Sequence, residues 1–210
     1  MHNAPLEEAR VGEALLDAGI ELVPEHVRTL TTYLNLLIKW NRVYNLTGIR
    51  DTAELVERHL AESLALAPLL HGTRIVDVGT GAGLPGIPLA IVEPDRSFVL
   101  VESRAKRVRF LRHVAGTLRL PNVAIEHSRV EDLPCERPFD TVLARAVAPP
   151  RELITMTRHL TAPGTILLLL TAARLEEAWR ELAEDSSLRP VAVGEPARPL
   201  RSSIVMMERI

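Results

Sequence analysis

The pattern of apolar positions changes once along the chain, near residue 70. Before that point apolar residues recur every three or four positions, as they do after Pro24 at Val27, Leu30, Leu34 and Leu37. This spacing places one apolar face along an α-helix, and a proline suits the first turn because no N–H is needed there. Asp51 followed by Glu54 resembles a capping box that opens a further helix, ending near Pro68. Residues 1–70 are therefore predicted to form an all-helical N-terminal part.

From Arg74 onward, short runs of β-branched and aliphatic residues alternate with helical stretches. The runs cover residues 74–78, 97–102, 123–127, 139–144, 165–171, 189–194 and 202–207. This alternation is typical of an α/β fold with a mainly parallel, doubly wound sheet covered on both faces. The last two runs are separated by "EPARPL", which is too short for a helical crossover, so we expect an antiparallel hairpin at one edge. We assign residues 71–210 to this sheet domain.

Composition narrows the class of protein. A chain of 210 residues with 47% hydrophobic content suits one globular domain with an N-terminal extension. The net charge of -2 argues against a protein that is basic all over but allows a local basic face. A single cysteine, Cys135, excludes an internal disulfide and a cysteine-based zinc site. Without a signal-peptide pattern or an apolar run long enough for a membrane span, we expect a cytoplasmic protein with no membrane association.

Three glycines follow the first expected strand, at Gly79, Gly81 and Gly83. Glycines at this point let the chain turn sharply into a helix and let its backbone approach a ligand, although a tight turn alone would also explain them. A dinucleotide-binding fingerprint requires a further glycine at the position of Leu84. This departure disfavours a pyrophosphate ligand.

Acidic and apolar residues follow the next two strands. Glu102 ends the second run, where a carboxylate is well placed to accept hydrogen bonds from two ribose hydroxyls. Val130 and Glu131 follow the third run and are placed to flank an adenine ring. With the glycine turn, these features resemble the class I S-adenosylmethionine-dependent methyltransferases over residues 74–171. The resemblance implies a Rossmann-like sheet and S-adenosyl-L-methionine as the cofactor.

A series of longer motifs narrows this resemblance. They read "WNRVYNLTGIRD", "VERHLAESLALAP", "VDVGTGAGLPGIPLAI", "SRAKRVRFLRHV", "SRVED" and "LARAVAPP". Their order and spacing resemble the bacterial glucose-inhibited division protein B family, the small-subunit (16S) ribosomal RNA guanine-N7 methyltransferases. The resemblance implies methylation of 16S rRNA in the small subunit or its assembly intermediate. It also implies cofactor contacts at Gly79, Leu84, Val130, Glu131 and Arg145. We expect the protein to be a monomer.

Three positions depart from the pattern of that family. Glu62 stands where an aspartate is expected, Thr171 where a lysine often ends the fifth strand, and Ser202 where a histidine is expected after Arg201. The first change is mild, because it keeps a carboxylate. The other two changes, at Thr171 and Ser202, fall where we expect the protein to face RNA rather than the cofactor.

The acceptor chemistry explains why the sequence shows no obvious catalytic residue. Guanine N7 carries a free lone pair, so its methylation needs positioning rather than a general base. A pyrimidine C5 acceptor would need a cysteine nucleophile, and Cys135 lies in a loop typical of a surface thiol. His59 is interpreted as a helix-packing residue, and the seven histidines show no metal-ligand spacing. We therefore assign no catalytic side chain and no metal.

Basic residues gather beside the expected cofactor site. The segment "SRAKRVRFLRHV" contains no acid, which predicts either a solvated helix face or a surface that attracts RNA phosphates. The RNA-binding candidates are Arg104, Lys106, Arg107, Arg109, Arg145 and Arg201. The segment "KWNRVYN" offers Lys39, Arg42 and Tyr44 as a second docking surface.

Two other functions fit parts of the sequence. An NAD(P)-dependent oxidoreductase uses a similar sheet but is disfavoured by Leu84 and by the lack of a second domain with a catalytic His or Tyr motif. A non-catalytic, cofactor-sensing, RNA-binding regulator could retain the same fold. Methyl transfer to RNA separates the enzyme from the regulator.

Overall fold

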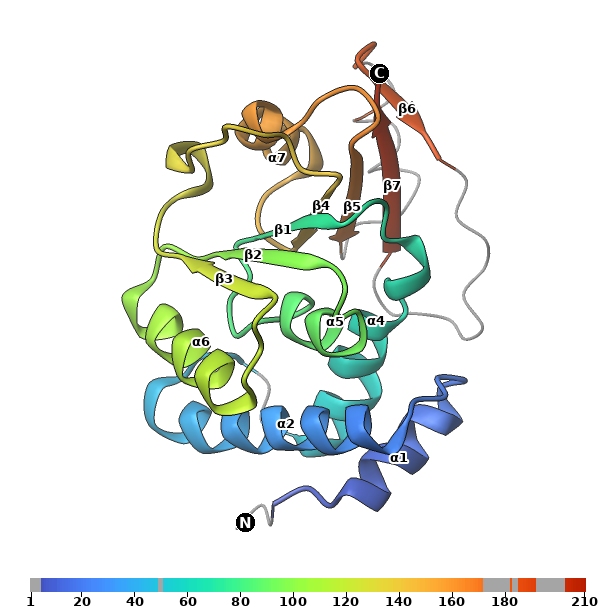
Figure 1. The fold of residues 1–210 in the computed structure, drawn as a ribbon, viewed down its shortest axis with the longest axis vertical. Helices are drawn as coiled ribbons and strands as arrows, with labels where there is room; N and C mark the ends of the chain where they lie inside the picture. The colour runs from blue at the N-terminus through green and yellow to red at the C-terminus, as the bar shows by residue number, and fades with distance from the viewer. Residues whose placement is uncertain (1–4, 49–50, 172–181, 183–184, 192–202) are drawn as a thin grey trace.

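The computed structural model describes residues 5–48, 51–171, 182, 185–191 and 203–210 (Figure 1). Its centre is a seven-stranded sheet in the order β3-β2-β1-β4-β5-β7-β6. The strands are β1 (Arg74–Val78), β2 (Ser97–Val101), β3 (Val123–Glu126), β4 (Thr141–Arg145), β5 (Ile166–Thr171), β6 (Leu188–Pro190) and β7 (Ser203–Arg209). The first five are parallel, and β7 is antiparallel to both β5 and β6. The α/β sheet and its antiparallel edge are confirmed, while residues 195–200 lie outside the described part.

The described residues before the sheet contain helices and no strand. These helices are α1 (Glu8–Asp17), α2 (Pro24–Tyr44), α3 (Thr52–Glu54), a π-helix η1 (Leu55–Leu60), α4 (Ala61–Leu64) and a 3-10 turn η2 (Ala67–Leu69). Pro24 occupies the first turn of α2, and the Asp51 carboxylate accepts a hydrogen bond of 3.1 Å from the Ala53 N–H. The prediction of a single α-helix after Asp51 is wrong in one respect, because Leu55–Leu60 form a π-helix, which is a wider turn. Such widened turns are frequent at functional sites.

Helices cover both faces of the sheet (Figure 1). The crossover elements are α5 (Gly86–Val92), α6 (Ala105–Leu118), η3 (Val130–Asp132), α7 (Pro150–Thr157) and η4 (Arg158–Leu160). Alternate strand residues point to opposite faces, so Ile75 of β1 enters one apolar cluster while Val76 and Val78 enter the other. Among the described residues, no helix combines the length and the apolar character needed to cross a membrane.

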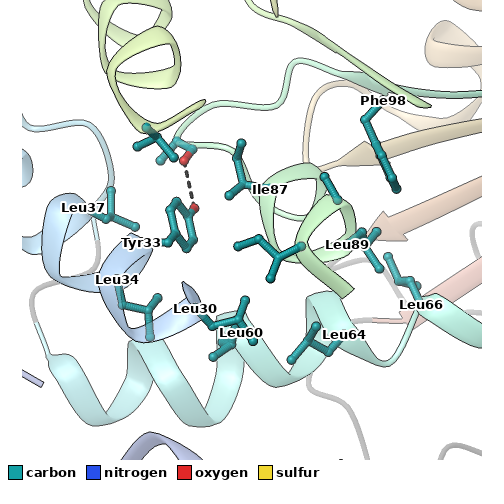
Figure 2. Close-up of a cluster of buried hydrophobic side chains, with 14 of the residues drawn as sticks. Leu30, Tyr33, Leu34, Leu37, Leu60, Leu64, Leu66, Ile87, Leu89 and Phe98 are labelled. Atoms are coloured by element: carbon teal, nitrogen blue, oxygen red, sulfur yellow. Dashed lines mark hydrogen bonds between the residues drawn. The ribbon is translucent and has the colours of Figure 1, made fainter. Parts of the chain in front are cut away.

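The N-terminal helices share a core with the helices of the sheet domain. Figure 2 shows Leu30 and Leu34 of α2 and Leu60 of η1 packed near Ile87 and Leu89 of α5. All five side chains are fully buried. One continuous core therefore joins the two parts of the chain, and the division into residues 1–70 and 71–210 stays a prediction.

The turn from β1 into α5 is held by the buried carboxylate of Asp77. Its Oδ2 accepts hydrogen bonds from the Thr80 hydroxyl at 2.6 Å and from the Gly86 N–H at 2.9 Å. A Cβ atom on Gly86 would lie 2.3 Å from Leu100 Cδ2 and 2.6 Å from Asp77 Oδ2, so only glycine fits there. Burial raises the pKa of Asp77 to about 7, since desolvation outweighs these two hydrogen bonds and the nearby Arg145 charge.

We predict that Asp77→Asn removes a pH dependence of stability. The folded chain keeps a proton on Asp77 that the unfolded chain releases, so the free energy of unfolding falls as pH rises from about 4 to 7. The slope is at most about 1.4 kcal/mol per pH unit. Denaturant titrations at about pH 5 and pH 6.5 should therefore show the wild type losing about 2 kcal/mol more than the variant. The same pH dependence in both proteins would contradict the assignment.

Candidate functional site

The three glycines of the turn after β1 differ in which atoms surround them. All have positive φ, at 62°, 64° and 94° for Gly79, Gly81 and Gly83. A Cβ atom on Gly79 would lie 2.8 Å from Val147 Cγ2, and one on Gly83 would lie 2.6 Å from Ile87 Cγ1. A Cβ atom on Gly81 would meet no atom closer than 3.8 Å. Packing within the chain therefore requires two of the glycines, while Gly81 leaves its backbone open to approach by a ligand.

The helix α2 holds this turn through Tyr33. The Tyr33 hydroxyl donates a hydrogen bond of 2.9 Å to the backbone oxygen of Ala82, and the ring is fully buried (Figure 2). Burial, and after it the nearby Asp77 carboxylate, raises the pKa of Tyr33, which keeps the hydroxyl a donor. Sequence reasoning missed this contact. The available signal was a tyrosine among the leucines of a buried helix face, because a buried tyrosine hydroxyl usually needs a partner.

Glu102 lies beside the glycine turn, directly after β2. The Thr80 N–H donates to the Val101 oxygen at 3.1 Å, which joins the turn to the end of that strand. The Glu102 side chain is 4% exposed and accepts a hydrogen bond of 2.8 Å from the Arg104 N–H at Oε1. Its Oε2 lies 3.2 Å from an Arg107 nitrogen. That same nitrogen would lie 3.9 Å from a Cβ atom on Gly81, so Arg107 stands between the two predicted cofactor residues.

The remaining predicted cofactor residues fall into different surroundings. Val130 is buried in the same apolar cluster as Val78 and Val101, the last residues of β1 and β2. Glu131 is exposed on η3, and Leu84 is half-buried beyond the glycines. Val130 therefore shares an apolar cluster with the last residues of the two strands that precede Gly79 and Glu102.

Arg145 ends β4 and is held from the N-terminal helices. One guanidinium nitrogen lies 3.0 Å from Glu62 Oε2 and also contacts His59 Nδ1. The two side chains of the ion pair are largely buried, at 14% exposed for Arg145 and 3% for Glu62. His59, expected to pack between helices, also faces this cation from the π-helix η1. Sequence reasoning noted Glu62 only as a departure from a motif and missed its pairing, because 83 residues separate it from Arg145.

The basic residues of α6, together with Arg104 directly before it, divide into two groups. Arg104, Lys106 and Arg109 are exposed, as is Arg112, whereas Arg107 is half-buried against Glu102. Arg201 and Ser202 lie outside the described residues, and the side chain of Thr171 is not among those described. Cys135 is half-buried, with its thiol directed at the Arg137 oxygen at 3.2 Å.

Gly81, Glu102 and Arg145 lie at or shortly after the carboxyl ends of β1, β2 and β4, which is where the ligand crevice of an open α/β sheet is expected. The strand order reverses there, because β1 pairs with β2 on one side and with β4 on the other. Open α/β sheets bind ligands at this kind of switch point. The crevice offers an open backbone at Gly81, a buried carboxylate at Glu102 and a fixed guanidinium at Arg145. Such a site can bind and orient a nucleoside-like ligand.

Comparison with known proteins gives a consistent result. The family model for rRNA small subunit methyltransferase G, GidB, matches residues 26–195. The ribosomal RNA small subunit methyltransferase G of Salmonella arizonae is 49% identical over 155 residues, which cover 74% of each chain. The enzyme of that name from Klebsiella pneumoniae is 43% identical over 182 residues, 87% of this chain and 88% of its own.

A solved structure supports the fold alone. The SAM dependent methyltransferase of Aquifex aeolicus superposes with a TM-score of 0.59 at 18% identity. The match covers 79% of this chain and 97% of that one. The chain belongs to the GidB family, rRNA small subunit methyltransferase G.

Proposed function

We propose that this protein is an S-adenosyl-L-methionine-dependent methyltransferase that methylates N7 of a guanine in 16S rRNA. The observation that carries the proposal is the crevice at the strand ends, where Gly81 leaves an open approach beside Glu102 in a chain of this family. The substrate is the small ribosomal subunit or its assembly intermediate. The protein acts on it as a monomer in the cytoplasm.

The residues of the crevice fit this cofactor. When bound, S-adenosylmethionine supplies a methyl group on a sulfonium cation, and it has no phosphate that would require a glycine in place of Leu84. The Glu102 carboxylate has lone pairs left for ribose hydroxyls, since the structure uses one donor on each oxygen. Val130 offers an apolar contact for adenine beside the exposed Glu131, and Gly79 and Gly83 shape the turn.

The chain then contributes chiefly by positioning the acceptor. Guanine N7 is already a nucleophile, so no side chain has to remove a proton from it. The thiol of Cys135 is directed at a backbone oxygen, which supports an acceptor that needs no cysteine nucleophile. Arg145, held by Glu62 at the crevice edge, is placed to contact the cofactor or the incoming nucleotide.

The basic residues beside the crevice suit the RNA substrate. Arg104, directly before α6, and Lys106 and Arg109 on this helix are exposed and available to phosphates, while Arg107 links the helix to Glu102. We assign RNA contacts to these four residues, to Arg145 and to Arg201. A phosphate-binding helix at this place would guide a guanine toward the strand ends.

The function is tested by methyl transfer from labelled S-adenosylmethionine to small subunits from cells that lack the protein. We expect label in 7-methylguanine of 16S rRNA. Binding of NADH in place of S-adenosylmethionine would favour an oxidoreductase. Binding of cofactor and RNA without transfer of label would favour a regulator.

We predict that Gly81→Ala abolishes cofactor binding while the protein stays folded. The new Cβ atom meets no protein atom closer than 3.8 Å, so the change costs only the strain of a positive φ, about 1–2 kcal/mol. Gly164→Ala is the matched control, because Gly164 also has a positive φ and open space but lies before β5. Calorimetric titration with S-adenosylmethionine should show loss of binding only for Gly81→Ala. Equal affinities in the two variants would overturn the role of Gly81.

We also predict that the double variant Lys106→Ala with Arg109→Ala weakens RNA binding and leaves cofactor affinity unchanged. Each lost phosphate contact should reduce the slope of log K against log salt by about one unit. Binding of small subunits at several salt concentrations measures this slope. Arg10→Ala with Arg28→Ala, two exposed arginines on α1 and on the first half of α2, serves as the charge-matched control. An unchanged slope in the α6 variant would assign these residues to solvent.

A further inference from the structure

Two acid-free stretches of the chain pack against each other. Residues 26–50 and 103–125 contain no aspartate or glutamate, although the whole chain has 27 acidic residues against 25 basic ones. Both lysines, Lys39 and Lys106, lie in these stretches. In the structure, the C-terminal half of α2 runs beneath α6 (Figure 1). The contact between the two helices therefore gathers positive charge on a protein whose net charge is negative.

Aromatic rings form the seam between these helices. Trp40 of α2 lies 5.6 Å from the Phe110 ring and 5.3 Å from the His113 ring of α6, measured between centroids. Tyr44, one turn further along α2, lies 5.2 Å from Trp40. Tyr44 and His113 are exposed, and Trp40 is half-buried. In a chain with only 3% aromatic residues, Trp40 and Tyr44 thus form a row of partly exposed rings at the edge of the core.

Cations border the row of rings. Lys106, Arg109 and His113 are spaced three and four residues apart on α6, so they share one ridge of the helix. All three side chains are exposed. We define the α2–α6 surface as these residues together with the rings of α2, namely Trp40, Tyr44, Lys106, Arg109 and His113.

We propose that the α2–α6 surface binds an unpaired stretch of the RNA substrate by stacking bases on its rings. This inference rests on the proposed function and names the form of RNA that the protein holds beside its crevice. Every base has a face that can stack on an aromatic ring, and the adjoining cations suit the phosphates between bases. Duplex RNA keeps its bases stacked inside the helix and offers no such face.

Both helices of the α2–α6 surface also contact the predicted cofactor site. Tyr33 and Trp40 lie seven residues apart on α2, which places them on one side of the helix and about 10 Å apart along its axis. Tyr33 contacts the glycine turn at Ala82, while Trp40 contacts α6. Arg107, next to Lys106 in the chain, contacts Glu102. A strand that presents a guanine at the crevice can therefore continue across the rings.

The first test separates stacking from charge. Tyr44→Ala should weaken binding of a single-stranded RNA oligonucleotide by about 10-fold without changing the salt slope, because a base contact and no phosphate contact is lost. Tyr44→Phe keeps the ring and should bind as the wild type does. Leu16→Ala, which removes an exposed apolar side chain from α1, is the control for surface change. Equal affinity of Tyr44→Ala and wild type would overturn the proposal.

The second test observes Trp40 directly. The chain has two tryptophans, so a Trp179→Phe background leaves Trp40 as the only one. We expect its fluorescence to be quenched by single-stranded RNA and much less by duplex RNA of equal length. RNA binding without a change in Trp40 emission would overturn the proposal.

Two further outcomes separate this inference from the function on which it rests. If the wild type transfers no methyl group to 16S rRNA, the proposed function fails. If methyl transfer occurs and Tyr44→Ala weakens binding of whole subunits but not of the RNA oligonucleotide, the rings contact a ribosomal protein. That result would overturn the assignment of this surface to RNA and leave the methyltransferase function intact.

Discussion

The buried carboxylate of Asp77 is the contact on which the geometry of the site depends. It joins the end of β1 to Thr80 and to the first residue of α5, so it closes the loop that carries all three turn glycines. Its Oδ1 has no hydrogen-bond partner among the described residues, and burial keeps the group protonated more readily than a surface aspartate. The turn is thus held by a group that is costly to bury. A feature with such a cost in free energy persists where the surrounding structure must hold a backbone in one shape, as at a ligand site.

The N-terminal helices complete the crevice as well as covering the sheet. Tyr33 fixes the glycine turn from one side, and Glu62 fixes the guanidinium of Arg145 from another. A buried ion pair is weak as a source of stability but strong as a means of orientation, because neither charge can move without losing its partner. Ala146, directly after Arg145, adopts a positive φ of 51° that is unusual for a residue other than glycine. The geometry at the strand ends is therefore set by side chains of the N-terminal helices as well as by the sheet.

Much of the fold could be predicted from periodicity and spacing. From Arg74 onward, strands alternate with helices in the order expected. The positions of Gly79, Glu102 and Val130 follow from the fact that each comes shortly after a predicted strand. The pairings that cross the chain could not be predicted, because nothing in the sequence near Glu62 or His59 indicates that their partner is Arg145. Likewise the pattern around Tyr33 shows a buried helix face but not the atom that its hydroxyl meets. Local propensity sets the elements, while these distant contacts depend on packing.

The shared core has a consequence for the order of folding. During synthesis, α2 leaves the ribosome before η1 and α5, so the side of Leu30 and Leu34 that these two elements cover stays exposed until α5 has been made. Contacts between segments distant in sequence carry a large entropic cost of loop closure and form late. Helix α2 is thus made before the elements that complete its packing. Until α5 and α6 have been made, a nascent chain of this protein exposes an apolar stripe on α2, the kind of surface on which chaperones act.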